Sequence, residues 1–156
     1  MARFTGGVNV AASVDQVWAR ITDWPAHGRW IPFTTVRLTG DRPDGVGAGF
    51  VGRTGFGPIS FDDSMRIVEW CPPVAGRPGH CRVEKCGRVV LGWAAFDVLS
   101  APEGGTAVRW TEEVRLAPVR LTWPADGLIA RAGRFGLARV LRSMARELES
   151  QVGSND

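Results

Sequence analysis

The sequence has no long hydrophobic run. None of its apolar stretches approaches the ~20 residues that a membrane-spanning helix needs. The first residues also lack the continuous apolar core of a secretory signal. We therefore expect no integral membrane segment, and we expect the protein to reside in the cytoplasm.

Side chains that bind metals are scarce. The three cysteines, Cys71, Cys81 and Cys86, are an odd number without the spacing of a metal site. Cys81 and Cys86 would fall on opposite faces of one strand, so we expect no bridge between them. The two histidines give no zinc signature, and we interpret both His27 and His80 as surface residues. The sequence predicts no metal and no cofactor.

Lysine is almost absent, because Lys85 is the only lysine among 19 basic residues. The net charge is +3, and the arginines are spread along the chain except on one face of the last predicted helix. We interpret that face as a solvated surface that Glu147 and Glu149 partly balance. Nucleic-acid-binding proteins usually cluster their positive charge, so we expect no nucleic-acid partner.

The length and composition predict a single domain. A chain of 156 residues is long enough to bury a substantial core. Its 44% hydrophobic and 22% charged residues are typical of a globular protein, and no repeat or low-complexity tract interrupts it. We expect one domain over residues 1–152, followed by a disordered tail at 153–156.

The clearest element is a long amphipathic helix predicted over residues 126–152. At ~100° per residue, its apolar side chains fall on one face and five arginines on the other. Gly133 lies at the centre of the apolar face and Gly136 at its edge, although glycine weakens a helix. Two interpretations stay open: close packing of the helix against a sheet, or a cavity beneath it. The apolar face comprises Ile129, Leu137, Val140, Leu141, Met144, Leu148 and Val152.

The preceding chain predicts one strand, two short helices and six further strands. Ser13 and Gln16 have the spacing of a capping box, which marks the start of the first helix. Asp23 is a candidate N-cap for the second, which runs through Trp30. The first strand is predicted over residues 4–10, and the others over 35–39, 49–54, 60–70, 80–87, 88–99 and 106–116. Pro118 and the Trp123-Pro124 pair are expected to end the last strand.

Alternation along the last two strands predicts which side chains face the interior. Small residues on an inner wall leave space. Glu112 is an acid on an otherwise apolar face, while Leu91, Trp93 and Ala95 would form an apolar patch on the outer face. That patch predicts a weak homodimer through Leu91 and Trp93. The inward sets are Val90, Gly92, Ala94, Phe96 and Val98 in one strand and Val108, Trp110, Glu112, Val114 and Leu116 in the other.

Glu112 and Asp63 are the acids predicted to reach the interior. Lys85 is a candidate partner if Cys81, Val83 and Lys85 form the inward set of their strand. A desolvated acid there could act as a general acid or base. The other interpretation is an ion pair or hydrogen bond at the rim of a pocket.

The order of these elements resembles the helix-grip fold of the START-related superfamily, also called SRPBCC, which includes polyketide cyclases. The resemblance covers nearly the whole chain, and its individual motifs are weak, but their order and spacing agree. It implies an α+β fold in which a curved antiparallel sheet of about seven strands wraps a long C-terminal helix. The residues that carry it are 17–18, Ile21, 23–24, 30–32, 47–50, 65–73, 87–92, Phe96, 104–106, 108–112 and the last helix.

The resemblance implies an apolar cavity between the sheet and the long helix. We therefore predict that the protein binds or carries a hydrophobic small molecule, such as a lipid, a polyketide or an aromatic compound. The first alternative is a cyclase or dehydratase that acts on a polyketide-like substrate, with Glu112 as the candidate catalytic acid or base. The second is a protein-interaction module. The predicted ligand pocket comprises Phe50, Met65, Gly92, Ala94, Phe96, Trp110, Glu112, Gly133 and Leu137.

Overall fold

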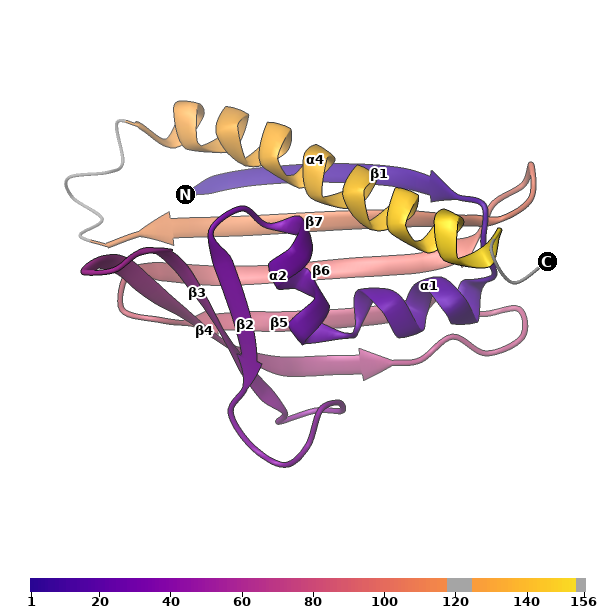
Figure 1. Cartoon of the computed structure of the whole chain (residues 1–156), viewed down its shortest axis with the longest axis horizontal. Coiled ribbons are helices and arrows are strands. Elements are labelled where there is room, and N and C mark those ends of the chain that lie inside the picture. Colours follow the sequence, from indigo (N-terminus) through magenta and orange to yellow (C-terminus); the bar gives the residue numbers. More distant parts are fainter. Residues whose placement is uncertain (118–124, 154–156) are drawn as a thin grey trace.

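The computed structural model describes residues 1–117 and 125–153, which form a seven-stranded antiparallel sheet crossed by one long helix (Figure 1). The strand order is β1-β7-β6-β5-β4-β3-β2. This arrangement confirms the predicted α+β helix-grip fold. The elements are β1 Ala2–Val10, α1 Val14–Ile21, η1 Trp24–Ala26, α2 His27–Trp30, β2 Thr34–Leu38, β3 Gly49–Phe56, β4 Ile59–Cys71, β5 Gly79–Cys86, β6 Val90–Ser100, β7 Thr106–Leu116 and α4 Asp126–Val152.

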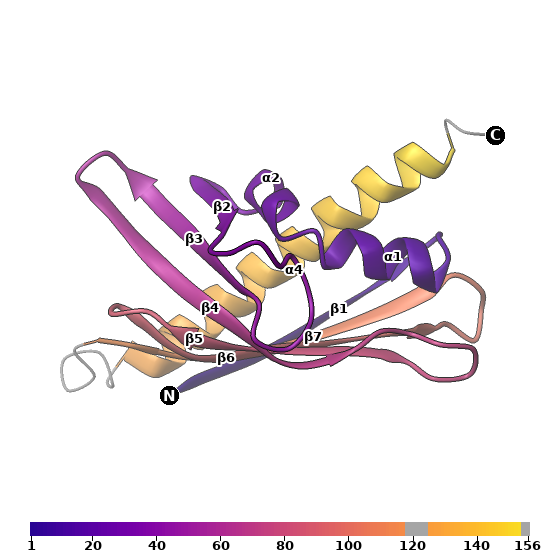
Figure 2. The same ribbon diagram turned by 90° about the horizontal axis from the view of Figure 1, so that it is seen from below.

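All the helices lie on one side of the sheet, as Figure 2 shows. In that view α4 crosses the sheet diagonally, and strands β3 and β4 curve away from the other strands toward α2. Along its length α4 packs on β1, and it also contacts α1 and α2. The sheet therefore has one inner face, turned toward the helices, and one outer face.

Local sequence signals explain how the short helices begin. The predicted capping box is present, because the Gln16 backbone N–H donates to Ser13 Oγ and the Ser13 N–H donates to Gln16 Oε1. The second predicted helix is divided into the 3-10 turn η1 and the short helix α2. Asp23 precedes η1, but its side chain makes no capping hydrogen bond.

The predicted alternation of strands β6 and β7 is confirmed. Their inward side chains are buried, and they include Ala94, Phe96, Val98, Val108 and Trp110. Strand ends differ from the predictions by a few residues at most, and a bulge in β4 between Ile67 and Glu69 interrupts its pairing with β5.

An aromatic cluster fills the space between the short helices and the sheet. The ring of Trp24 stacks on that of Phe50 with 4.2 Å between centroids, and the rings of Phe96 and Trp110 lie 5.2 Å apart. His27 belongs to this cluster, with its ring centroid 5.1 Å from that of Trp30. The prediction that His27 is a surface residue was wrong, because the residue is only 6% exposed.

Helix α4 is held in place by acids on its own surface. Glu147 accepts a hydrogen bond from Trp30 Nε1 at 2.7 Å and lies 3.3 Å from Arg29 and 3.6 Å from Arg20. Glu149 accepts from the Ala11 backbone N–H at 2.9 Å. Both glutamates thus contact α1, α2 and the end of β1. They do not balance the arginines on the solvent-facing side of α4, contrary to the prediction from the sequence.

The five arginines on the solvent-facing side of α4 are exposed, and within residues 1–117 and 125–153 none of them has a carboxylate partner. They are Arg131, Arg134, Arg139, Arg142 and Arg146.

Some predictions fall outside the described residues. Pro118, the Trp123-Pro124 pair and the last three residues of the expected tail are among them. No helix within the described ranges is both long and apolar enough to cross a membrane.

Candidate functional site

Three charged side chains from three strands meet on the inner face of the sheet. Lys85 Nζ, on β5, lies 2.7 Å from Asp63 Oδ2 on β4 and 3.7 Å from Glu112 Oε2 on β7. The three side chains are mostly buried, with exposed fractions of 8% for Lys85, 15% for Asp63 and 19% for Glu112. We call these three residues the inner charge cluster.

Small residues on β6 allow Lys85 to reach Glu112. Strand β6 lies between β5 and β7, with Gly92 opposite Lys85 and Ala94 opposite Glu112. Because neither residue has a long side chain, the Lys85 side chain can extend across β6. The space that the sequence predicted above Gly92 and Ala94 is therefore partly occupied by Lys85.

Gly92 also has a backbone role. Its φ is +130°, and a Cβ there would lie 1.9 Å from the Glu113 carbonyl oxygen. Only glycine adopts this conformation readily. The backbone conformation therefore requires a glycine at position 92, and the absence of a side chain there leaves space on the inner face.

Lys85 is a charged donor. Burial alone would lower the pKa of Lys85, but Glu112 and Asp63 outweigh the effect of burial and raise that pKa above its ordinary value. Lys85 is therefore protonated at neutral pH, and it can donate hydrogen bonds but cannot attack as a free amine.

The two acids differ in how their oxygens are used. Glu112 Oε1 accepts from Trp110 Nε1 at 3.1 Å, and Oε2 faces Lys85. Asp63 Oδ2 accepts from Lys85, whereas Asp63 Oδ1 is buried and has no hydrogen-bond partner among the described residues. The unused acceptor of the inner charge cluster thus belongs to Asp63 and not to Glu112, the predicted acid or base.

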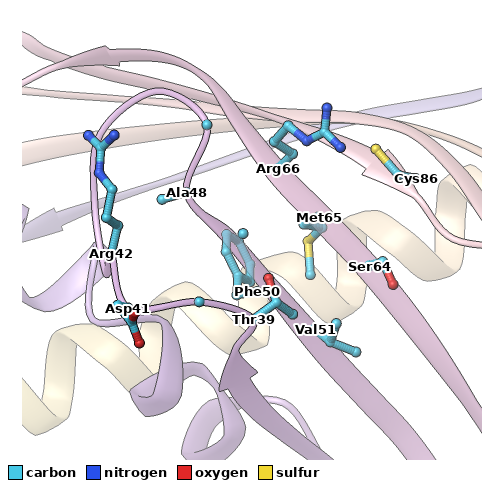
Figure 3. Close-up of a pocket in the computed structure, with 13 residues that line it drawn as sticks. Thr39, Asp41, Arg42, Ala48, Phe50, Val51, Ser64, Met65, Arg66 and Cys86 are labelled. Carbon is cyan, nitrogen blue, oxygen red and sulfur yellow. The ribbon is translucent and has the colours of Figure 1, made fainter.

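An open recess of about 550 Å³ lies beside the loop between β2 and β3 (Figure 3). Residues 39–42, 47–51, 64–66 and Cys86 line it, with Arg42, Arg66 and Asp41 as its charged side chains. Of the predicted pocket it includes Phe50 and Met65. Met65 also approaches the inner charge cluster, since its Sδ lies 3.9 Å from Lys85 Nζ. No sequence pattern predicts this recess.

The chain matches one known protein family over nearly its whole length. The model of the family described as "Polyketide cyclase / dehydrase and lipid transport" matches residues 1–149. The chain belongs to this family. No curated protein sequence matches it.

Solved structures of this family's fold superpose on nearly the whole chain. The protein TTHA0849 of Thermus thermophilus has a TM-score of 0.76 at 11% identity, with 96% of this chain and 98% of that chain covered. The Zhui aromatase/cyclase of a Streptomyces species has 0.70 at 17%, covering 96% and 94%. A norcoclaurine synthase of Thalictrum has 0.63 at 15%, also covering 96% and 94%. At these identities the likeness shows the fold alone.

Several predicted pocket residues of this polyketide cyclase family member lie in its aromatic core. Phe50 stacks on Trp24, and Phe96 packs against Trp110. All four are buried. They form a packed wall next to the inner charge cluster and contribute little open space of their own.

The structure favours close packing at Gly133 over a cavity beneath it. A Cβ built on Gly133 would lie 2.4 Å from the nearest atom of the Phe4 ring, on β1. The neighbouring Leu137 is buried, and its Cγ lies 3.1 Å from where a Cβ of Gly6 would stand. At Gly136 the situation is reversed, because a Cβ there would have no atom within 4 Å.

We expect opposite results from the same substitution at these two glycines. Gly133→Ala should lower the free energy of unfolding by about 1–3 kcal/mol, because the Phe4 ring must move. Gly136→Ala should raise it by about 0.5–1 kcal/mol, because alanine favours the helix and meets no neighbour. Urea unfolding of both variants measures the difference. Equal effects at the two sites would contradict the close contact with Phe4.

His80 and Cys81 lie apart from the inner charge cluster. His80 is half-buried on the outer face, where Nδ1 lies 2.7 Å from Asp97 Oδ1 and Nε2 lies 3.1 Å from Glu69 Oε2. Cys81 is fully buried, and burial, aided by Cys71 and Glu69, raises the pKa of its thiol to about 12. No group of three metal-binding side chains occurs in the part of the chain that the structure describes.

On the outer face of β6, two arginines cover part of the predicted apolar patch. The Arg82 guanidinium carbon lies 4.4 Å from the centroid of the Trp93 ring, and that of Arg3 lies 5.4 Å from it. Cation–π contacts of this kind cover part of the indole. The homodimer through Leu91 and Trp93 stays a prediction.

Proposed function

We propose that the protein binds a hydrophobic small molecule against the inner face of its sheet, with the polar end of the molecule at the inner charge cluster. The observation that carries the proposal is a cluster of three charged side chains on an otherwise apolar face, next to aromatic walls. Burying charges costs free energy even when they are paired, and such groups are common at functional sites. The family description, which names lipid transport and polyketide cyclases, supports a ligand of this kind.

In this proposal the predicted pocket is divided into two parts. Met65, Gly92 and Glu112 lie beside Lys85, and Ala94 lies opposite Glu112. These four residues would surround the polar end of the ligand. Aromatic residues and α4 would surround its apolar part. A neutral apolar molecule gains affinity there by leaving water, while the charged groups fix its orientation.

Filling the space above β6 should weaken binding. We expect Ala94→Leu to reduce the affinity for the neutral fluorescent probe N-phenyl-1-naphthylamine by about tenfold or more, because the larger side chain occupies the inner face. Ala95→Leu, one residue along β6 on the outer face, is the matched control and should leave the affinity unchanged. The probe's fluorescence measures binding, and native mass spectrometry of gently purified protein would identify a co-purified molecule.

The proposal fails if the wild-type protein does not bind the probe. It also fails if the two substitutions weaken binding equally, since only Ala94 faces the ligand. Melting temperatures of both variants exclude a general loss of folding as the cause.

The alternative is a cyclase or dehydratase acting on a polyketide-like substrate. The likeness to an aromatase/cyclase and the family description favour it. The sequence indicates Glu112 as the candidate acid or base, but both of its oxygens already face partners. In such a reaction Asp63 is better placed to accept a proton, and the Lys85 ammonium could stabilise a developing oxyanion.

A third candidate, an interaction module, has weaker support. The predicted dimer contact at Trp93 is partly covered by Arg3 and Arg82. The exposed arginines of α4 are the surface that an acidic partner would meet first.

A further inference from the structure

The inner charge cluster does not balance its own charge. It holds two carboxylates and one ammonium, and the raised pKa of Lys85 keeps that ammonium charged. With both carboxylates ionised, the cluster has a net charge of −1. Of the ion pairs between described residues, only those of Lys85 involve Asp63 or Glu112.

A ligand carboxylate would therefore meet an unfavourable environment. It would approach two carboxylates and a single ammonium that already donates to Asp63 at 2.7 Å. Repulsion between like charges is strong where little water is present. The ligand would also lose its hydration on leaving water. A fatty acid or another apolar acid is thus disfavoured at this site.

A hydroxyl group would meet matching partners. Asp63 Oδ1 is buried without a donor, and a hydroxyl can donate to a carboxylate. The oxygen of the same hydroxyl can accept from the Lys85 ammonium by replacing the long contact of Nζ with Met65 Sδ at 3.9 Å. Hydrogen bonds to charged groups are stronger than those between neutral groups.

Access to Asp63 depends on Met65. Asp63 pairs with Gly52 across the sheet, and the Met65 methyl carbon lies 3.7 Å from where a Cβ of Gly52 would stand. Methionine is unbranched and flexible, so its side chain can move when a ligand enters. The Asp63 side chain keeps 15% of its surface exposed even without that movement.

We propose that this site selects neutral apolar molecules that carry a hydroxyl group, such as phenols or alcohols, and discriminates against apolar carboxylates. The selection rests on the proposed binding function. Asp63 is the specificity-determining residue, because its charge repels the carboxylate and its free oxygen accepts from the hydroxyl.

Three probes that share the naphthalene ring test the selection: naphthalene, 2-naphthol and 2-naphthoate, each displacing N-phenyl-1-naphthylamine at pH 7. For the wild-type protein we expect 2-naphthol to bind about tenfold or more tightly than naphthalene. We expect 2-naphthoate to bind more weakly than naphthalene. Wild-type protein alone decides this order, so the test does not depend on a variant that folds.

Two neighbouring substitutions assign the effect to one carboxylate. Asp63→Asn removes a negative charge from the inner face, so 2-naphthoate should bind about tenfold more tightly and 2-naphthol should lose much of its advantage. Asp62→Asn is the matched control, because Asp62 is exposed and pairs with Arg53. It should change neither affinity.

The outcomes separate this inference from the proposed function. If N-phenyl-1-naphthylamine does not bind, both fail. If naphthalene displaces it but 2-naphthoate binds as tightly as 2-naphthol, hydrophobic binding stands and the hydroxyl selection is wrong. The same conclusion follows if Asp63→Asn and Asp62→Asn behave alike.

Discussion

Replacing Lys85 with methionine is expected to lower the free energy of unfolding by about 3–5 kcal/mol, because two mostly buried carboxylates lose their only cationic partner among the described residues. Methionine keeps much of the apolar stem, so the loss reports the charge and not a cavity. Urea unfolding at pH 7 measures it. A loss below about 1 kcal/mol would mean that water solvates the carboxylates well enough to replace Lys85.

An ion pair on the other face provides the control. Arg53 lies 3.5 Å from Asp62, with exposed fractions of 57% and 43% for the two side chains. Arg53→Met should cost no more than about 1 kcal/mol, because exposed pairs contribute little. In the triple variant Lys85→Met, Asp63→Asn, Glu112→Gln most of the lost stability should return, since no charge is left unpaired.

Acidification should destabilise the protein through His27. Burial lowers the pKa of His27 to about 4, although the Ile21 carbonyl and Asp23 act in the opposite direction. Its Nε2–H donates to the Ile21 carbonyl oxygen at 2.8 Å, and burial keeps the ring neutral at pH 7 despite that hydrogen bond. In the unfolded chain the side chain is exposed, and histidine then has its ordinary pKa of about 6.5. Between these values the unfolded state binds a proton that the folded state does not.

The contribution of neutral His27 to the free energy of unfolding is therefore fully present above about pH 6.5, and it is lost as the pH falls toward 4. At 1.36 kcal/mol per pKa unit, the difference between 6.5 and about 4 amounts to about 3 kcal/mol. Unfolding in urea at several pH values measures this loss. His27→Gln, which can still donate to Ile21, should be less stable at pH 7 but should lose about 3 kcal/mol less over the same range. Parallel curves for the two proteins would exclude His27 as the cause.

Much of the fold could be predicted because its signals are local. The period of α4, the Ser13 and Gln16 capping box and the alternation of β6 and β7 each depend on residues close in sequence. The alternation also placed Glu112 on the inner face, whereas Asp63 was only a candidate and Lys85 depended on which face of its strand turned inward. Period and spacing assign a side chain to one face of its strand. The order of the strands in the sheet then decides which of these side chains meet.

The remaining features depend on contacts between distant segments. Gly133 faces Phe4, almost a whole chain length away, so the sequence could not decide between close packing and a cavity. His27 is buried because Trp24, Trp30 and Trp110 surround its ring, and a four-residue helix gives no period from which to predict that.

The inward engagement of Glu147 and Glu149 has an electrical consequence. Two negative charges of α4 pair with α1, α2 and the end of β1. The exposed side of α4 keeps five arginines, so the charge of the molecule is distributed asymmetrically. Dissolved anions within about 8 Å of that side at physiological ionic strength are attracted to it, whereas more distant ones are screened. The protein as a whole has a charge of only +3, yet five of its positive charges lie together on one side of one helix.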